Sequence, residues 1–243
     1  MLIKVKNLTK KFGPFTAVEN ISFNLAKGEV LGFLGPNGAG KTTTMRMITG
    51  FLPPTSGQIM ISKHNIQEFP ILTKKKIGYV PEGAPLYGEM TVYNFLKFIF
   101  NLRKSDTFND RSSIDLSIDR LGLEKVLYQQ IDTLSKGYKR RVGLAQAILH
   151  DPEILILDEP TDGLDPNQKH EVRKLITEMS SNKAIIISTH ILEEVDAVCT
   201  RAMIISNGKM LVDKSPRDLL KMNKKKNSTL DDVFRKLTLD EEL

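Results

Sequence analysis

The chain has 243 residues, of which 40% are hydrophobic and 26% are charged, a composition typical of folded globular proteins and not of disordered or fibrous ones. Its single cysteine, Cys199, excludes an internal disulfide and a cysteine-cluster zinc site and fits a reducing, cytosolic compartment. No run of about 18 apolar residues occurs, so we expect no membrane span. The net charge of +6 comes partly from lysine runs at residues 74–76 and 224–226. These runs have no interleaved aromatic residues, so they predict solvated loops and no nucleic-acid partner.

The first thirty residues have the alternating pattern of antiparallel strands. Apolar side chains recur two apart at Ile3 and Val5, and again at Ile21, Phe23 and Leu25. Because this is the spacing of one buried sheet face, we expect an N-terminal antiparallel β subdomain.

The next segment changes to a continuous apolar run that leads into a glycine-rich loop. Residues 30–34 predict a strand buried on both faces, and a helix follows over residues 41–49, closed by Gly50. The loop between them matches G-x-x-x-x-G-K-[ST] in the strand–loop–helix context that this pattern requires, which favours phosphate binding over a plain glycine-rich turn. Its backbone N–H groups would face phosphate oxygens, with Lys41 on the β- and γ-phosphates and the Thr42 hydroxyl on Mg²⁺. The predicted nucleotide-binding residues of the loop are Gly35, Pro36, Asn37, Gly38, Ala39, Gly40, Lys41, Thr42 and Thr43.

Residues from about 88 to 150 have helical spacing instead. Apolar side chains recur at Val92, Phe95, Leu96 and Ile99, as on one face of a helix. We therefore expect an inserted helical subdomain over residues 88–150, with a polar loop at residues 105–113.

A second apolar run, at residues 154–157, ends in the adjacent carboxylates Asp158 and Glu159. Open α/β sheets bind ligands at the carboxyl ends of their strands. We expect Asp158 to hold Mg²⁺ and Glu159 to accept a proton from an attacking water. The alternative is a solvated loop entry without a ligand.

The remaining elements complete a parallel sheet and a tail. A helix beginning at Asp165 and Pro166 and a further apolar run at residues 184–187 give strand–helix–strand order. Asn207 and Gly208 predict a hairpin turn, and a capped helix begins near Ser215. We expect one domain over residues 1–220 and a tail over residues 221–243. A short amphipathic helix of the tail would carry Leu230, Val233, Phe234 and Leu237 on one face.

Taken in order, these motifs resemble the nucleotide-binding subunits of ABC transporters over nearly the whole chain. Residues 134–138, Leu-Ser-Lys-Gly-Tyr, stand where that family has the signature L-S-G-G-Q, although Lys136 and Tyr138 depart from it. The resemblance implies that Ser135 and Gly137 bind the γ-phosphate of a nucleotide held by another subunit. A serine at a helix N-cap in front of free N–H groups suits such an anion.

The resemblance also assigns further residues. Residues 161–165 match the loop at the dimer seam, and His190 matches the switch histidine that senses the γ-phosphate and assists catalysis beside Glu159 and Lys41. Glu82 stands where a glutamine usually contacts Mg²⁺ and the lytic water; its carboxylate can still ligate Mg²⁺ but adds negative charge. Phe12 matches the aromatic that stacks on adenine, with Phe15 as the competing choice.

The resemblance implies a RecA-like P-loop NTPase of the α/β class, with ATP and Mg²⁺ as cofactors. It also implies a second copy of the cassette as partner and an integral-membrane permease, of which the apolar segment around Phe95 would form part of the docking surface. The branch that it resembles serves separate export-type permeases, and the expected location is the inner face of the cell membrane. One alternative, a soluble ABC-type ATPase acting on nucleic acid or ribosomes, lacks the long insertions or fused second cassette of those proteins. Another, a P-loop kinase or GTPase, leaves the signature and His190 unexplained.

Overall fold

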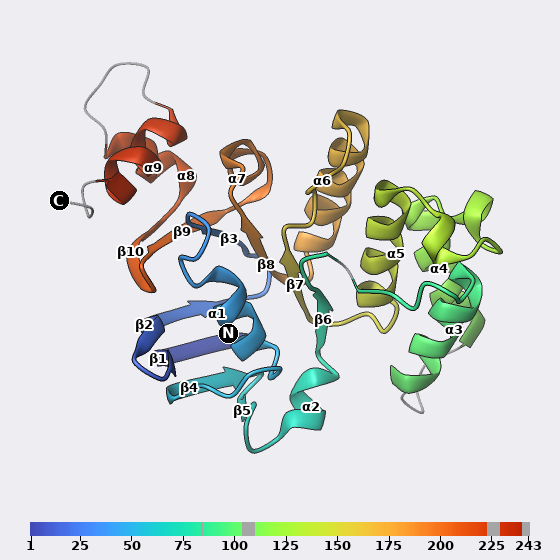
Figure 1. The fold of residues 1–243 in the computed structure, drawn as a ribbon, viewed down its shortest axis with the longest axis horizontal. Coiled ribbons are helices and arrows are strands. Elements are labelled where there is room, and N and C mark those ends of the chain that lie inside the picture. Colours follow the sequence, from blue (N-terminus) through green and yellow to red (C-terminus); the bar gives the residue numbers. More distant parts are fainter. Residues whose placement is uncertain (84, 104–109, 223–228, 240–243) are drawn as a thin grey trace.

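The computed structural model describes residues 1–83, 85–103, 110–222 and 229–239. Within these ranges the chain forms two β-sheets. A group of helices lies at one end of the molecule, and the antiparallel sheet and the C-terminal helices lie toward the other (Figure 1).

A six-stranded, mainly parallel sheet forms the centre. Its strand order is β10-β9-β3-β8-β7-β6; β10 pairs antiparallel with β9, and the other pairs are parallel. The apolar runs predicted as strands lie at its centre, where every residue of β3, β7 and β8 is buried. The predicted parallel core and the hairpin are therefore confirmed. The strands are β3 (Val30–Leu34), β6 (Ile77–Val80), β7 (Ile154–Asp158), β8 (Ala184–Thr189), β9 (Arg201–Ser206) and β10 (Lys209–Lys214).

The two faces of this sheet carry separate hydrophobic cores. Ile154 and Ile156 of β7 join the core shared with α1 (Lys41–Ile48) and the antiparallel sheet. Leu155 and Leu157 join the core shared with the inserted helices. Because successive strand residues point to opposite faces, an unbroken apolar run suits a strand that is covered on both sides.

The second sheet is antiparallel and has the strand order β2-β1-β4-β5. It confirms the antiparallel N-terminal subdomain. The strands that follow α1 were not predicted: the first three residues of β4 are exposed, so only Ile59 and Ile61 show the alternation of a half-buried strand. The strands are β1 (Ile3–Phe12), β2 (Phe15–Leu25), β4 (Ser56–Ile61) and β5 (His64–Asn65).

In the described residues between β6 and β7, where the sequence predicts an inserted helical subdomain, three α-helices occur: α3 (Val92–Arg103), α4 (Asp110–Leu121) and α5 (Lys136–Ile148). Both α3 and α4 contact α5, and one-turn 3-10 helices occupy Glu124–Val126 and Ile131–Thr133. The predicted loop at residues 105–113 is wrong at its end, because α4 already begins at residue 110. Ile114, Ile118 and Leu121 are buried at helical spacing. Residues 104–109 lie outside the described ranges.

Two further helices begin at the predicted caps. The Asp165 carboxylate and the Gln168 side chain form a capping box at the start of α6 (Pro166–Ser180), and the Ser215 hydroxyl caps α8 (Pro216–Lys221). Two short helices, α2 (Pro70–Lys74) and α7 (Leu192–Val198), complete the domain.

A terminal helix, α9 (Leu230–Leu239), contacts α8. Its Leu230 and Val233 side chains are buried, and Phe234 and Leu237 pack against the same core. The lysine run at 224–226 lies outside the described residues. We find no helix in the described ranges with both the length and the apolar character that a membrane crossing needs.

Candidate functional site

The glycine-rich loop joins the end of β3 to the start of α1. Its conformation requires glycine at Gly40, which has φ of 102°. A Cβ atom there would lie 2.5 Å from the Ala17 carbonyl oxygen. The Lys41 side chain is only 7% exposed, and its Nζ donates hydrogen bonds to the carbonyl oxygens of Gly35 at 2.7 Å and Pro36 at 3.1 Å. Burial lowers the pKa of Lys41, while the carboxylates of Glu159 and Asp158 act in the opposite direction.

A pocket of about 460 Å³ opens in front of this loop. It is lined by residues from the loop, the antiparallel sheet and the ends of the central strands, so the fold brings together parts that are far apart in sequence. Asp158 is not among the lining residues, and neither are Gly35, Pro36 and Ala39 of the loop. Phe12 and Phe15 both line it and both are exposed, so the geometry leaves the choice between them open. The predicted residues on its lining are Phe12, Asn37, Gly38, Gly40, Lys41, Thr42, Thr43, Glu82 and Glu159.

Asp158 is fully buried at the end of β7. Its Oδ1 accepts a hydrogen bond from the Ser188 hydroxyl on β8. Its Oδ2 is buried without a hydrogen-bond partner among the described residues. An ionised carboxylate oxygen can only accept, and leaving it unpaired inside a protein is unfavourable, so this atom fits a cation. The described residues contain no cluster of three or more His, Cys, Asp or Glu residues that could hold a metal, and a hydroxyl such as that of Thr42 would have to complete the ligands.

Glu159 is held in an unusual backbone conformation. Its φ of 50° lies in the left-handed region, which non-glycine residues rarely adopt and which occurs often at functional sites. Its backbone N–H donates to the Ser188 carbonyl oxygen at 3.0 Å. The Glu159 Oε2 atom lies 2.9 Å from His190 Nδ1, with 53% of the histidine side chain exposed and 13% of the glutamate side chain exposed. Glu159 and His190, two of the three predicted catalytic residues, therefore contact each other. Glu159 lines the pocket, whereas His190 is not among its lining residues.

The signature segment lies elsewhere. The Ser135 hydroxyl accepts from the Tyr138 N–H at 3.3 Å and so caps α5, as its N-cap pattern predicts, but Ser135 is exposed and is not part of the pocket lining. Gly137 is buried, and a Cβ there would lie 2.5 Å from the Gln168 side chain that caps α6. Gly137 thus allows the start of α5 to lie against the start of α6.

Three polar residues of this region were not predicted as site residues. Arg140 is buried at 6% exposure and donates to the Pro81 carbonyl oxygen at 3.5 Å, although its place in a basic run gave no sign of burial. Burial lowers its pKa, and Asp162 opposes that shift. Ser188 bonds to Asp158 as described, and Glu194 is buried beside the seam loop. A buried carboxylate in a polar helix has no periodic signal in one sequence.

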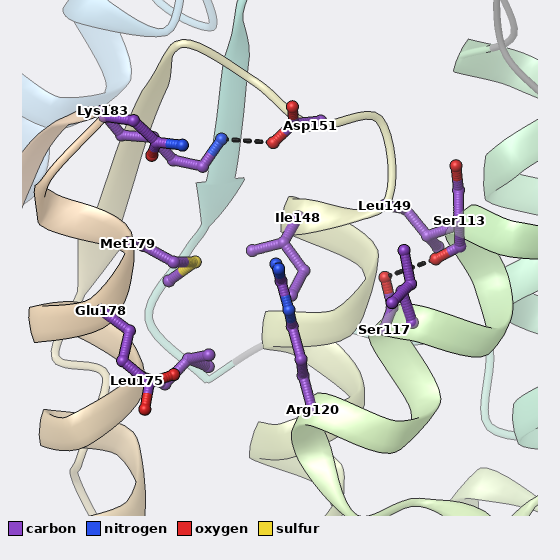
Figure 2. A pocket seen from close by; sticks show the side chains of 12 residues that line it. Ser113, Ser117, Arg120, Ile148, Leu149, Asp151, Leu175, Glu178, Met179 and Lys183 are labelled. Atoms are coloured by element: carbon purple, nitrogen blue, oxygen red, sulfur yellow. Dashed lines mark hydrogen bonds and ion pairs between the residues drawn. The ribbon is translucent and has the colours of Figure 1, made fainter.

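A second pocket, of about 340 Å³, lies between α4, α5 and α6. Figure 2 shows the Arg120 side chain from α4 between the other two helices and the ion pair of Lys183 with Asp151 at the margin. None of the predicted site residues lines it. The candidate site is therefore the pocket in front of the phosphate loop.

The fold and this pocket define a P-loop ATPase: a glycine-rich loop with a buried lysine shares the pocket with the carboxylates of Glu82 and Glu159, which follow the parallel strands β6 and β7. Comparison with known proteins agrees with this class. A sequence profile described as ABC transporter matches residues 18–162. The chain is 36% identical over 219 residues to the uncharacterized ABC transporter ATP-binding protein YhcH of Bacillus subtilis, covering 89% of this chain and 71% of that protein.

Two further similarities extend the comparison. The bacitracin transport ATP-binding protein BcrA of Bacillus licheniformis is 39% identical over 227 residues, which is 93% of this chain and 73% of that protein. A solved structure described as the ATP-binding subunit of an ABC transporter superposes with a TM-score of 0.89 at 27% identity, covering 98% of this chain and 99% of that one. The chain belongs to the ABC transporter family, as an ATP-binding and ATP-hydrolysing cassette of that family.

Proposed function

We propose that this cassette is the motor subunit of an exporter: two copies close over two ATP molecules, and hydrolysis reopens them to drive a separate membrane permease. The relative named for bacitracin transport and the resemblance to cassettes of export-type permeases support this direction of transport. Such a subunit works on the cytoplasmic face of the membrane that holds its permease. The observation that carries the proposal is the contact of Glu159 with His190 beside the phosphate loop.

In this proposal Lys41 binds the β- and γ-phosphates after exchanging its loop carbonyl contacts for phosphate oxygens, which are stronger acceptors because they are charged. Glu159 orients a water molecule and takes its proton as the water oxygen attacks the γ-phosphorus. The bond from that phosphorus to the bridging oxygen breaks, and ADP and inorganic phosphate result. His190 fixes the Glu159 carboxylate through its Nδ1 atom.

The residues present also fit Mg²⁺. Asp158 would supply its unpaired Oδ2 atom, Thr42 its hydroxyl and Glu82 a carboxylate oxygen, all ligand types that Mg²⁺ prefers. When bound, the ion neutralises charge on the β- and γ-phosphates.

A second copy is needed because the start of α5, which carries the signature segment, lies outside the nucleotide pocket of its own chain. Ser135 is exposed at the N-cap of α5, and the first turn of a helix offers unpaired N–H groups to an anion. Facing another chain, Ser135 and Gly137 would complete the partner's pocket and their N–H groups would bind its γ-phosphate. Hydrolysis then removes the charge that holds the two chains together.

The permease would dock in an apolar groove of about 330 Å³ between the end of α1, β6 and α3. Phe95 and Ile99 of the predicted docking segment line it together with Phe51. In contrast, Val92 and Leu96 are fully buried in the core. The groove continues to Pro81, the residue before Glu82, so an occupant would contact the loop that enters the nucleotide pocket.

The test is Glu159→Gln. We expect ATP turnover to fall by at least about a hundredfold because the amide cannot accept the proton. ATP binding should persist, and ATP should make the variant accumulate as a dimer in sedimentation experiments. The control is Glu171→Gln, an exposed glutamate on α6, which should leave all three measurements unchanged.

Near-normal turnover in Glu159→Gln would remove Glu159 from the catalytic role. A variant that stays monomeric with bound ATP would instead overturn the closed dimer. These two outcomes therefore test the hydrolysis step and the assembly step separately.

A further inference from the structure

Glu194 is a buried acid that the steps above do not use. It lies on α7 and is 2% exposed. Its Oε2 atom accepts a hydrogen bond from the Thr189 hydroxyl at 2.8 Å, and its Oε1 atom accepts one from the Thr161 hydroxyl. Both threonines are buried as well. One carboxylate thus joins two segments that are 28 positions apart in the sequence.

These two segments carry the catalytic pair. Thr161 follows Glu159 by two residues at the end of β7, and Thr189 directly precedes His190 at the end of β8. The Thr189 Oγ1 atom also accepts from the Ile191 N–H at 3.1 Å, so the hydroxyl fixes the backbone on the far side of His190. The Glu194 carboxylate therefore links the segment that follows Glu159 to the residue that precedes His190.

Packing alone does not account for an acid at this position. Taking a carboxylate out of water is unfavourable unless hydrogen bonds compensate it, and burial raises the pKa of Glu194 while the Thr189 hydroxyl opposes the shift. An apolar side chain would fill the same space on α7 without that cost. What the acid adds is two directed bonds, one to each segment.

We propose that Glu194 is a positioning residue for ATP hydrolysis: by bridging the hydroxyls of Thr161 and Thr189 it holds Glu159 and His190 at the separation that the reaction needs. This inference rests on the proposed function, because it assigns Glu194 a role through that pair. Glu194 touches neither nucleotide nor water in this role.

The experiment compares Glu194→Ala, Glu194→Gln and Glu193→Gln in the full chain. Misplacing a catalytic group by about 1 Å can lower a rate by about a hundredfold, so we expect Glu194→Ala to lower kcat by at least about tenfold with KM for ATP unchanged. Glu194→Gln should restore most of the rate, since its amide can still bond to both hydroxyls. Glu193 is exposed on the same helix, and Glu193→Gln should match the unmodified chain.

Thr189→Val and Thr189→Ser keep the proposal testable if Glu194→Ala fails to fold. Valine has the shape of threonine without the hydroxyl, whereas serine keeps the hydroxyl. We expect only the valine variant to lose kcat, again with KM unchanged. Equal kcat in the two variants, or a rise in KM with kcat unchanged, overturns the positioning role.

A double variant separates this proposal from the one on which it rests. If Glu194 acts through His190, adding Glu194→Ala to His190→Ala should change kcat much less than it does alone. Fully additive losses would overturn the role of Glu194 while leaving that of Glu159 and His190 intact. If Glu159→Gln itself turns over normally, the proposed function fails first.

Discussion

Two regions of the molecule carry the predicted site, and they are built differently. At the ends of β3, β7 and β8, the functional side chains are held by partners from other elements: Lys41 by the loop carbonyls, Asp158 by Ser188 and Glu159 by His190. At the start of α5, the Ser135 hydroxyl bonds only within its own helix turn in the contacts described for it. In the proposed function, the strand ends would carry out the chemistry within one chain, and the start of α5 would bind a nucleotide held by another chain.

The largest effect should follow from loss of Lys41 at the strand ends. Removing one positioned charge from a phosphoryl-transfer site lowers the rate by about a hundredfold to a thousandfold, and we expect this of Lys41→Ala together with weaker ATP binding by calorimetry. The exposed Lys125 of the helical part is the control, and Lys125→Ala should retain the full rate. Equal rates in both variants would mean that the loop does not bind phosphate.

The free energy of unfolding should depend on pH through His150, a partly buried histidine just after the end of α5. Its Nε2 atom lies 3.1 Å from the Arg103 guanidinium of α3 and 3.2 Å from the Ile77 carbonyl oxygen. Burial, and secondly Arg103, lowers the pKa of His150 from its ordinary 6.5 to about 4. Below pH 6.5 the unfolded chain therefore binds a proton that the folded chain refuses until about pH 4, so this contribution to stability is complete above pH 6.5 and is lost as the pH falls.

A shift of this size corresponds to about 3 kcal/mol of unfolding free energy between pH 7 and pH 4. Urea unfolding of His150→Gln should lose that part of the pH dependence, whereas the exposed His170 should be replaceable by glutamine without changing it. The same pH slope in His150→Gln as in the unmodified chain would contradict the expectation.

A smaller loss of ATPase activity is expected from changes at the start of α5. Two substitutions of Ser135 that differ in charge separate its role in binding phosphate from its role in capping the helix. Ser135→Asp and Ser135→Asn both keep a good N-cap, but only the aspartate would place a negative charge against phosphate. We expect Ser135→Asp to lower ATPase activity by at least about tenfold and Ser135→Asn to lower it far less. Equal losses would indicate that Ser135 serves its helix alone.

Mixing the Lys41→Ala and Ser135→Asp chains, both of which should have low activity, tests whether the two regions complement each other between chains. A pair of one Lys41→Ala chain and one Ser135→Asp chain contains one composite site with both residues intact. Random pairing of equal amounts should therefore restore up to about a quarter of the normal rate. No recovery, despite mixed dimers seen by mass spectrometry, would mean that each site lies within one chain.

The smallest effect should distinguish the two aromatics at the pocket rim. Loss of a stacking ring costs about 1 kcal/mol or more, which is about a fivefold rise in KM for ATP. We expect that rise for Phe12→Ala and little change for Phe15→Ala, with kcat unchanged in both. A larger rise in KM for Phe15→Ala than for Phe12→Ala would mean that Phe15 stacks on the adenine ring.

Much of the fold could be predicted because its signals are local. The apolar runs of β3, β7 and β8, the capping residues Asp165 and Ser215 and the turn at Asn207 each specify a conformation over a few residues, and the structure has them all. The short strands β4 to β6 were missed because runs of only two to six residues give little periodicity.

The residues of the candidate site could be predicted from the sequence, but the hydrogen bonds that hold them in place could not. The phosphate-loop pattern predicted Lys41 and the end of the apolar run in β7 predicted Glu159, and both line the candidate pocket, whereas Asp158 is buried and does not line it. The contacts of Glu194 with two threonines, and the burial of Arg140 within a basic run, depend on the packing of helices against strand ends that are distant in sequence. Such contacts are set by tertiary structure and leave no pattern in a single chain.

The double use of β7 has a consequence for how the molecule unfolds. Since Ile154 and Ile156 close one core while Leu155 and Leu157 close the other, opening either core exposes apolar surface of the strand that supports its neighbour. Neither core can therefore unfold without exposing apolar side chains of the other. The two cores should thus unfold as one cooperative unit, in a single calorimetric transition whose van't Hoff and calorimetric enthalpies agree.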